Sequence, residues 1–465
     1  MKTGTTLRVG IVLLSITAST SQAQSATPIA DAYREPANRI IQAALADSSA
    51  WNRLAELTDR FGPRLSGSAS LERAIDWIIA GMKKDQLENV RGEPVMVPHW
   101  VRGEEWAKLI LPREAPLNMI GLGRSVGTPP RGITADVMVV TSFDELSARA
   151  AEARGKIVLF DVPFTTYGQT VQYRSRGASA AARAGAVASL IRSVSSASMQ
   201  NPHTGAMGYD TTVAKIPAAA LSVEDAAMLH RMVDRGERVR VTLKMSARTL
   251  PDAPSRNIVA ELKGSEKPDE IVVLGGHIDS WDVGQGAMDD AGGVVAAWEA
   301  VKLLKRLGLR PKRTVRVVAW TNEENGGRGA DGYRDAHRAE LDKHVMALES
   351  DNGVFDPRGV GITAGEGGLA MAADIATLLK PIGADTARAG GGGADTAPIG
   401  ALGVPTMSPT VDGTKYFWYH HSSADTMDKL DPREMAECVA LMAVFAYVVA
   451  DMPGTLPRAP IRPRN

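Results

Sequence analysis

Cysteine is almost absent from this 465-residue sequence, in which Cys438 is the only example. One cysteine excludes an internal disulfide. Its apolar neighbours in a predicted helix over residues 432–450 indicate a packed core thiol. The sequence also has no Asn-X-Ser/Thr acceptor site, so we expect no N-linked glycan.

A net charge is lacking as well. Lys plus Arg and Asp plus Glu both number 53. Such a balance provides no overall field that would attract nucleic acid or an anionic membrane surface. We therefore expect no nucleic-acid partner.

The N-terminal apolar run is too short to anchor the chain in a bilayer. Lys2 and Arg8 precede an apolar stretch over residues 9–16, and Ser21-Gln22-Ala23 supplies a small-X-small cleavage site. This pattern predicts a secretory signal peptide over residues 1–23, with mature protein starting near Gln24. We expect a secreted or periplasmic protein without a membrane anchor.

The length and the internal punctuation predict two domains. Short strand-like pieces with two Ala-rich helical patterns between them, around 176–185 and 223–235, fill residues 127–248, and a Pro-rich boundary follows at 249–254. We interpret 127–248 as a β-rich domain inserted into a main domain formed by 24–126 and 249–452; the alternative is one continuous large sheet. The Pro/Arg-rich residues 453–465 predict a disordered tail.

Strands that alternate with helices in the main domain predict an α/β fold, a mixed and mostly parallel sheet sandwiched by helices. Predicted strands at 271–274, 315–320 and 345–348 are each followed by a polar loop, and a fourth polar loop follows residues 404–405. These loops supply His277, Asp279, Asp289 and Asp290; Glu323 and Glu324; Asp351; and His420 and His421. Loops after parallel strands meet at one edge of a sheet. The alternative for any single loop is an ordinary solvated turn.

Imidazole nitrogens and carboxylate oxygens gathered in this way suit zinc. His277 and Asp351 would hold one ion, Glu324 and His421 a second, and Asp289 would bridge the two. Such a pair lowers the pKa of a water molecule toward neutrality. Glu323 is then free for general acid/base work. Asp279 would orient the imidazole of His277 through its second nitrogen.

Five ordered motifs carry a family resemblance: DRFGPRLSGS, GGHIDSWDVGQGAMDDAGG, TNEENGG, ESDNG and HHSSADTMD. They resemble the zinc-dependent aminopeptidase/glutamate carboxypeptidase family, and most closely its carboxypeptidase Q branch. The resemblance implies a zinc exopeptidase fold with two zinc ions and an inserted protease-associated-like domain. It also implies a homodimer and a cis peptide bond after Asp289. By the family's pattern the ligands are His277, Asp289, Glu324, Asp351 and His421, and the base is Glu323.

That family's His-Ser/Thr-X-X-Asp-Thr pattern distinguishes between the two adjacent histidines, His420 and His421. His421, Ser422, Asp425 and Thr426 match it, which makes His421 the ligand. His420 is then either a packing residue or a hydrogen-bond donor to the tetrahedral oxyanion.

The resulting hypothesis is a secreted di-zinc exopeptidase that hydrolyses small peptides, with dipeptides carrying free termini as the expected substrates. A hydroxide between the metals would attack, with Glu323 as general base. The alternatives are an aminopeptidase acting on longer peptides, a one-zinc glutaminyl cyclase, and a non-catalytic receptor-like protein of the same fold. Candidate residues for the two substrate termini are Asp282, Asp290, Asn352, His420 and Lys415.

Overall fold

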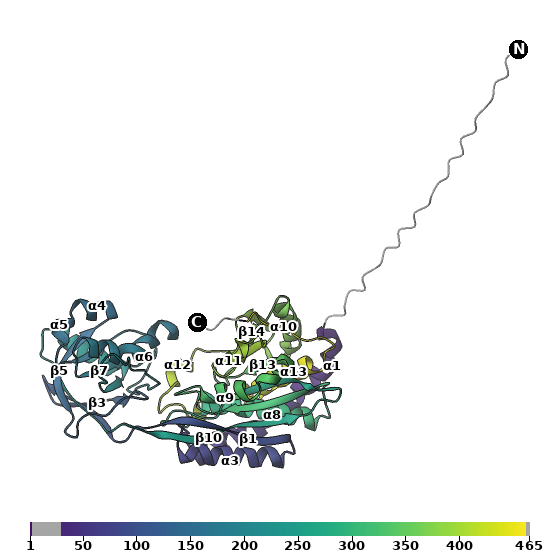
Figure 1. The fold of residues 1–465 in the computed structure, drawn as a ribbon, viewed down its shortest axis with the longest axis horizontal. Coiled ribbons are helices and arrows are strands. Elements are labelled where there is room, and N and C mark those ends of the chain that lie inside the picture. Colours follow the sequence, from purple (N-terminus) through teal and green to yellow (C-terminus); the bar gives the residue numbers. More distant parts are fainter. Residues whose placement is uncertain (2–28, 462–465) are drawn as a thin grey trace.

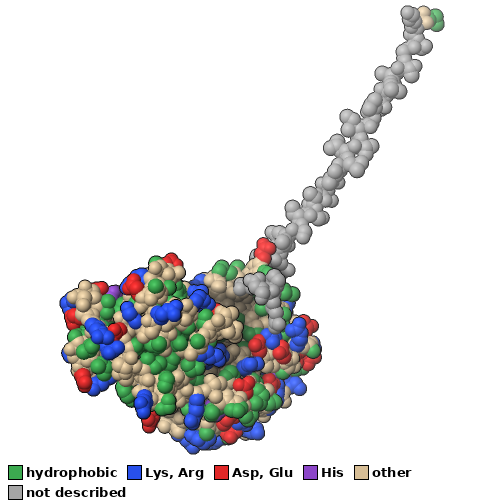
Figure 2. All heavy atoms as spheres, turned by 60° about the vertical axis from the view of Figure 1, so that its left-hand side comes forward, with side chains coloured by type: hydrophobic (Ala, Val, Ile, Leu, Met, Phe, Trp, Pro, Cys, Tyr) green, Lys and Arg blue, Asp and Glu red, His purple; other side chains and the backbone are tan. Residues whose placement is uncertain are grey.

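The computed structural model describes Met1 and residues 29–461, and the predicted signal peptide therefore lies outside the described residues apart from Met1. Two eight-stranded sheets form two lobes that lie side by side (Figure 1). No helix in the described part of the chain is long and apolar enough to cross a bilayer. On the face drawn in Figure 2, basic and acidic side chains lie interspersed.

The first sheet belongs to the main domain and has the order β1-β10-β12-β11-β13-β16-β14-β15. Neighbours β12, β11, β13 and β16 run parallel, whereas β1, β10 and β14 each pair antiparallel with a neighbour. The predicted mixed α/β sheet is confirmed. Its strands are β1 (Glu88–Val101), β10 (Arg248–Leu262), β11 (Lys267–His277), β12 (Arg313–Trp320), β13 (His344–Glu349), β14 (Pro357–Thr363), β15 (Thr386–Ala389) and β16 (Thr406–Val411).

Helices bury both faces of this sheet, which explains why its central strands read as continuous apolar runs. Val272 and Leu274 of β11 face the larger core, and Ile271 and Val273 face a second core on the opposite side. The larger core is covered by α1 (Ile29–Leu45), α2 (Ser49–Phe61), α3 (Ala69–Lys84), α8 (Gly292–Arg306), α10 (Gly368–Ala376) and α13 (Pro432–Asp451). The opposite side carries α9 (Arg328–Ala336) and α11 (Ala397–Gly400).

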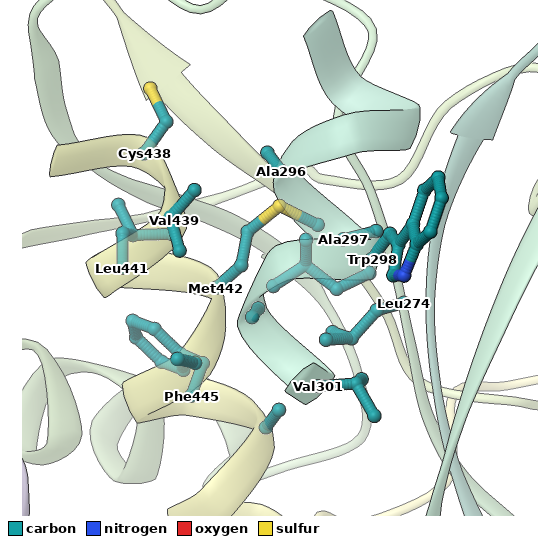
Figure 3. Close-up of a cluster of buried hydrophobic side chains, with 14 of the residues drawn as sticks. Leu274, Ala296, Ala297, Trp298, Val301, Cys438, Val439, Leu441, Met442 and Phe445 are labelled. Carbon is teal, nitrogen blue, oxygen red and sulfur yellow. The ribbon is translucent and has the colours of Figure 1, made fainter. Parts of the chain in front are cut away.

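Helix α13 lies in the middle of the larger core. Asp431 caps its first turn by accepting hydrogen bonds from the backbone N–H groups of Arg433 and Glu434, and Pro432 occupies the first helical position. Figure 3 shows Met442 of α13 beside Ala296 of α8. Cys438 is buried on the same helix, as predicted for a core thiol.

The second sheet has the order β3-β2-β9-β5-β6-β7-β8-β4 and begins earlier in the chain than predicted. Its strands are β2 (Glu105–Leu111), β3 (Ala115–Leu117), β4 (Met119–Gly121), β5 (Ile133–Val140), β6 (Ile157–Phe160), β7 (Ala188–Arg192), β8 (Ala218–Leu221) and β9 (Arg240–Met245). The sheet therefore spans 105–245, so the predicted start at 127 is too late, because β2 pairs with β9 rather than with the first sheet.

The inserted domain contains α6 (Tyr167–Arg183) and α7 (Val223–Asp234), which overlap the two predicted helical patterns, and also α4 (Phe143–Ala148) and α5 (Ala150–Ala153), which were not predicted. The two faces of its sheet are covered by these helices. Strands β5 to β8 are parallel, and parallel neighbours need helical crossovers to join them. The protease-associated-like identity of this domain stays a prediction.

The predicted disorder of residues 453–465 is wrong for the described part of that segment. Leu456 and Ala459 are buried, the N–H of Gly365 donates to the carbonyl of Pro457, and Arg458 donates to the carbonyls of Leu341 and Leu402. Pro and Arg composition suggested disorder, but here the backbone pairs with neighbouring loops.

Candidate metal site

The predicted site residues meet at the carboxyl edge of four adjacent parallel strands. His277 ends β11, Glu323 and Glu324 follow β12, and Asp351 follows β13. Beyond β16, the short helix α12 (Tyr416–Tyr419) leads into His420 and His421. Asp289 lies in a turn of π-helix (Ala287–Ala291) just before α8, and the peptide bond that follows it is cis, as the resemblance implied.

One carboxylate lies between two groups of donor atoms. In the first group, His277 Nε2 is 3.2 Å from Oδ1 of Asp289 and 3.3 Å from Oδ1 of Asp351. In the second group, His421 Nε2 is 3.0 Å from Oε2 of Glu324 and 3.4 Å from Oδ2 of Asp289. The two oxygens of Asp289 thus face different groups, which is the arrangement of a bridging ligand.

The spacing within each group fits zinc. Two ligand atoms that lie ~2.0–2.1 Å from one tetrahedral zinc are ~3.3 Å from each other. The four separations above are close to this value. Oδ2 of Asp289 is buried and has no hydrogen-bond partner, so it is free to bind an ion.

The site also gathers several carboxyl groups, whose ionised forms bound cations would stabilise. Burial, reinforced by the neighbouring carboxylates, raises the pKa of Glu323 to about 8. For the same two reasons the pKa of Glu324 lies well above its ordinary value, and that of Asp351 is raised. Carboxylates this close destabilise one another's ionised forms unless positive charge is supplied.

The ring of His277 is oriented differently from the prediction. Its Nδ1 is 2.9 Å from the backbone carbonyl of Asp279, but 3.9 Å from the nearer carboxylate oxygen of that residue. The carboxylate of Asp279 instead accepts hydrogen bonds from the N–H groups of Glu323 and Glu324. Since Nδ1 donates to a carbonyl, Nε2 keeps its lone pair for a metal. Asp279 therefore supports both the His277 ring and the glutamate pair.

Three further charged residues shape the loops, and we did not single them out for this role in the sequence. Asp425 accepts hydrogen bonds from the N–H groups of Ala287, Met288 and Asp289. Asp290 accepts from the N–H groups of His277 and Gly293. The buried Arg64 donates to the carbonyls of Gly62, Ile278, Gln285 and Gly286. Arg64 lies in the motif DRFGPRLSGS and Asp425 in HHSSADTMD, so the motifs were the feature of the sequence that could have indicated them.

Glycine allows helix α8 to approach the end of β11 closely. A Cβ atom on Gly293 would lie 2.0 Å from the carbonyl oxygen of Ser350 and 2.4 Å from Oδ1 of Asp290. Neither atom can move without disturbing the loop that carries Asp351 or the bonds of Asp290. The sequence therefore needs glycine at this position.

His420 lies close enough to the metal groups to take part. Its Nε2 is 3.5 Å from Oδ2 of Asp289, and its ring stacks on that of His421 with centroids 3.5 Å apart. Burial, together with the neighbouring His421, lowers the pKa of His420 well below its ordinary value, so the ring is neutral at pH 7. A neutral imidazole can either donate to a substrate oxygen or bind metal.

Comparison with known families supports this geometry. Residues 257–446 match peptidase family M28. The chain is 49% identical over 430 residues to carboxypeptidase Q of Pongo abelii, covering 92% of this chain and 91% of that protein. It is 50% identical over 414 residues to human carboxypeptidase Q, covering 89% and 88% of the two chains.

Solved structures show the same fold. A peptidase M28 precursor from Shewanella amazonensis SB2B superposes with a TM-score of 0.90 at 37% identity, covering 92% of this chain and 99% of that one. A zinc aminopeptidase from Bacillus subtilis superposes with a TM-score of 0.66 at 20% identity, covering 87% and 96% of the chains. At that identity the second likeness concerns the fold alone.

Proposed function

Because this chain belongs to peptidase family M28 and is a zinc-dependent exopeptidase, we propose that it hydrolyses dipeptides with free termini. The observation that carries the proposal is the pair of donor groups sharing Asp289, with Glu323 beside them. The sequence similarity to proteins named carboxypeptidase Q supports a peptidase that acts at the end of a peptide chain.

In this proposal the chain binds two zinc ions. His277 and Asp351 would hold the first, Glu324 and His421 would hold the second, and Asp289 would contribute one oxygen to each. When bound, the ions lower the pKa of a water molecule and polarise the peptide carbonyl.

Glu323 is proposed to move the proton. It is adjacent to a ligand but belongs to neither donor group, and its side chain is partly exposed whereas Glu324 is buried. Its carboxylate would take the proton of the attacking water and return it to the leaving amine. His420, neutral and beside Asp289, would donate to the oxyanion that develops on the carbonyl.

Two of the candidate residues for binding the substrate termini, Asp282 and Asp290, already have hydrogen-bond partners. Asp282 forms a two-bond ion pair with Arg102, and Asp290 is committed to backbone N–H groups. Arg174 of α6 is buried, and its Nη1 lies 3.2 Å from Nδ1 of His421. Its Nε is buried without a hydrogen-bond partner. Such a guanidinium suits the C-terminal carboxylate of a short substrate.

Substrate length tests this proposal. We expect one dipeptide to have a higher kcat/KM than its N-acetyl form, its C-terminal amide and its tripeptide extension. Each altered form leaves a buried group at one end of the substrate site unpaired. Replacing Arg174 by Met should remove the discrimination against the amide and leave that against the N-acetyl form. Equal rates for all four substrates would instead favour an aminopeptidase or a broad peptidase.

Export and dimer formation complete the proposal. Residues 1–23 support cleavage after Ala23, and N-terminal sequencing of the exported protein should begin at or near Gln24. A homodimer, expected from the resemblance, would appear as twice the monomer mass in light scattering.

A further inference from the structure

A loop of the inserted domain binds the segment of the main domain that carries His420 and His421. We call residues 193–204, between β7 and β8, the insert loop, and residues 417–422 the histidine loop. The histidine loop overlaps the end of α12, which faces the inserted lobe in Figure 1. Groups of the insert loop bind the histidine loop at four points: Ser195 Oγ to the Phe417 carbonyl (2.5 Å), His203 Nδ1 to the His420 carbonyl (2.6 Å), Thr204 N to the His421 carbonyl (2.9 Å) and Asn201 Nδ2 to Ser422 Oγ (2.8 Å).

Two of these bonds flank His421, the proposed metal ligand. His421 has φ +59°, in the left-handed region that non-glycine residues seldom adopt. Such a conformation is strained for a residue with a side chain and persists only where the surroundings enforce it. The carbonyl of His420 belongs to the peptide plane before the Cα of His421, and the carbonyl of His421 to the plane after it. His203 and Thr204 therefore hold the planes on both sides of the strained residue.

The insert loop is itself fixed to the second sheet. The N–H of His203 donates to Ser193 Oγ, which donates to the carbonyl of Leu221 at the end of β8. Thr204 Oγ1 donates to the carbonyl of Gly121 at the end of β4. Two short chains of hydrogen bonds, one through Ser193 and His203 and one through Thr204, thus connect the second sheet to the histidine loop.

His203 donates a hydrogen bond through Nδ1 to the carbonyl of His420. Its side chain is buried, and its Nδ1 faces a carbonyl, so Nδ1 carries the proton. Burial lowers its pKa to about 4, which keeps the ring neutral near pH 7.

We propose that the insert loop is a positioning element for His421, with His203 and Thr204 holding that residue in the conformation that directs Nε2 at Glu324 and Asp289. The metal site on this side is complete only when the inserted domain is docked. The proposal rests on the assignment of His421 as a ligand.

Zinc binding to the purified full-length protein tests it, measured by competition with a chromophoric chelator so that two binding steps are resolved. In His203→Ala, we expect one ion to bind ~10–100-fold more weakly, as for loss of other groups that orient a ligand, while the other ion keeps its affinity. His203→Asn places an amide N–H near the position of Nδ1 and should recover most of the loss. His230→Ala is the matched control, since His230 lies in the same domain but binds Asp161.

Unchanged affinity in His203→Ala would overturn the proposal, as would equal weakening of both ions or a His203→Asn variant as weak as His203→Ala. The last result would indicate packing rather than a hydrogen bond. If His203→Ala does not fold, Asn201→Ala removes only the bond to Ser422 and should weaken the same ion by less than ~10-fold. His421→Ala separates the two claims, because normal binding of both ions in that variant would refute the ligand assignment itself.

Discussion

The two donor groups of the metal site are supported in different ways. His277 and Asp351 follow neighbouring strands of one sheet, and the loops around them are bound by main-domain residues such as Arg64 and Asp290. Glu324 is equally a main-domain residue, but its partner His421 depends on a loop from the second sheet. One half of the site is therefore built within a single domain, and the other half requires two domains to be docked.

Docking of the inserted domain should therefore affect metal binding in one half of the site only. A displacement of the inserted domain would leave the first group intact and disturb the second. Asp289 contributes one carboxylate oxygen to each group, and its backbone N–H donates to Asp425 from the loop that follows His421. Variants of individual ligands can show whether the two halves behave as separate units.

The largest effect is expected from Asp289→Asn, which removes a charge from both halves at once. Both zinc ions should bind more weakly, and kcat/KM should fall by ~10³-fold or more, corresponding to several kcal/mol of lost transition-state stabilisation. Zinc titration and dipeptide hydrolysis measure the two effects. Asp282→Asn is the control on the same loop, because Asp282 pairs with Arg102. Normal binding of one ion in Asp289→Asn would show that this residue is not shared.

The adjacent glutamates should respond differently, and this contrast tests whether only one of them belongs to the second half. Glu323→Gln should keep both zinc ions while kcat falls by ~10²–10⁴-fold, because a general base is lost. Glu324→Gln should lose the ion held with His421 and leave the ion held by His277. Metal analysis after dialysis distinguishes them. Loss of zinc from Glu323→Gln would mean that the two residues exchange roles.

The two halves also differ in how far the sequence could predict them. The order of strands and polar loops was sufficient to bring His277, Asp289, Glu323, Glu324 and Asp351 to one edge, because parallel strands direct their following loops to the same side. The support of His421 could not be predicted, since residues 193–204 carry no pattern that points to a loop more than 200 residues away. The role of the Asp279 carboxylate was missed because spacing does not distinguish a side chain from its own carbonyl. The start of the inserted sheet was missed because β2 could have paired with either sheet.

The last effect expected is on stability, and it concerns the charge of Glu323, which belongs to neither half but lies beside both. Without metal, the pKa of Glu323 is raised from its ordinary 4.5 to about 8, so the folded chain holds a proton that the unfolded chain releases. Such a group stabilises the fold fully below pH 4.5, and this stabilisation is lost as pH rises through about 8. One group changes the free energy of unfolding by at most ~1.4 kcal/mol per pH unit in that window. Urea unfolding of chelator-treated protein should therefore show lower stability at pH 8 than at pH 5, with a smaller difference in Glu323→Gln. Zinc should reduce the difference in the parent protein, because bound cations stabilise the ionised carboxylates at every pH in the window. A chelator-treated protein that is as stable at pH 8 as at pH 5 would show that the two halves already balance their charges without metal.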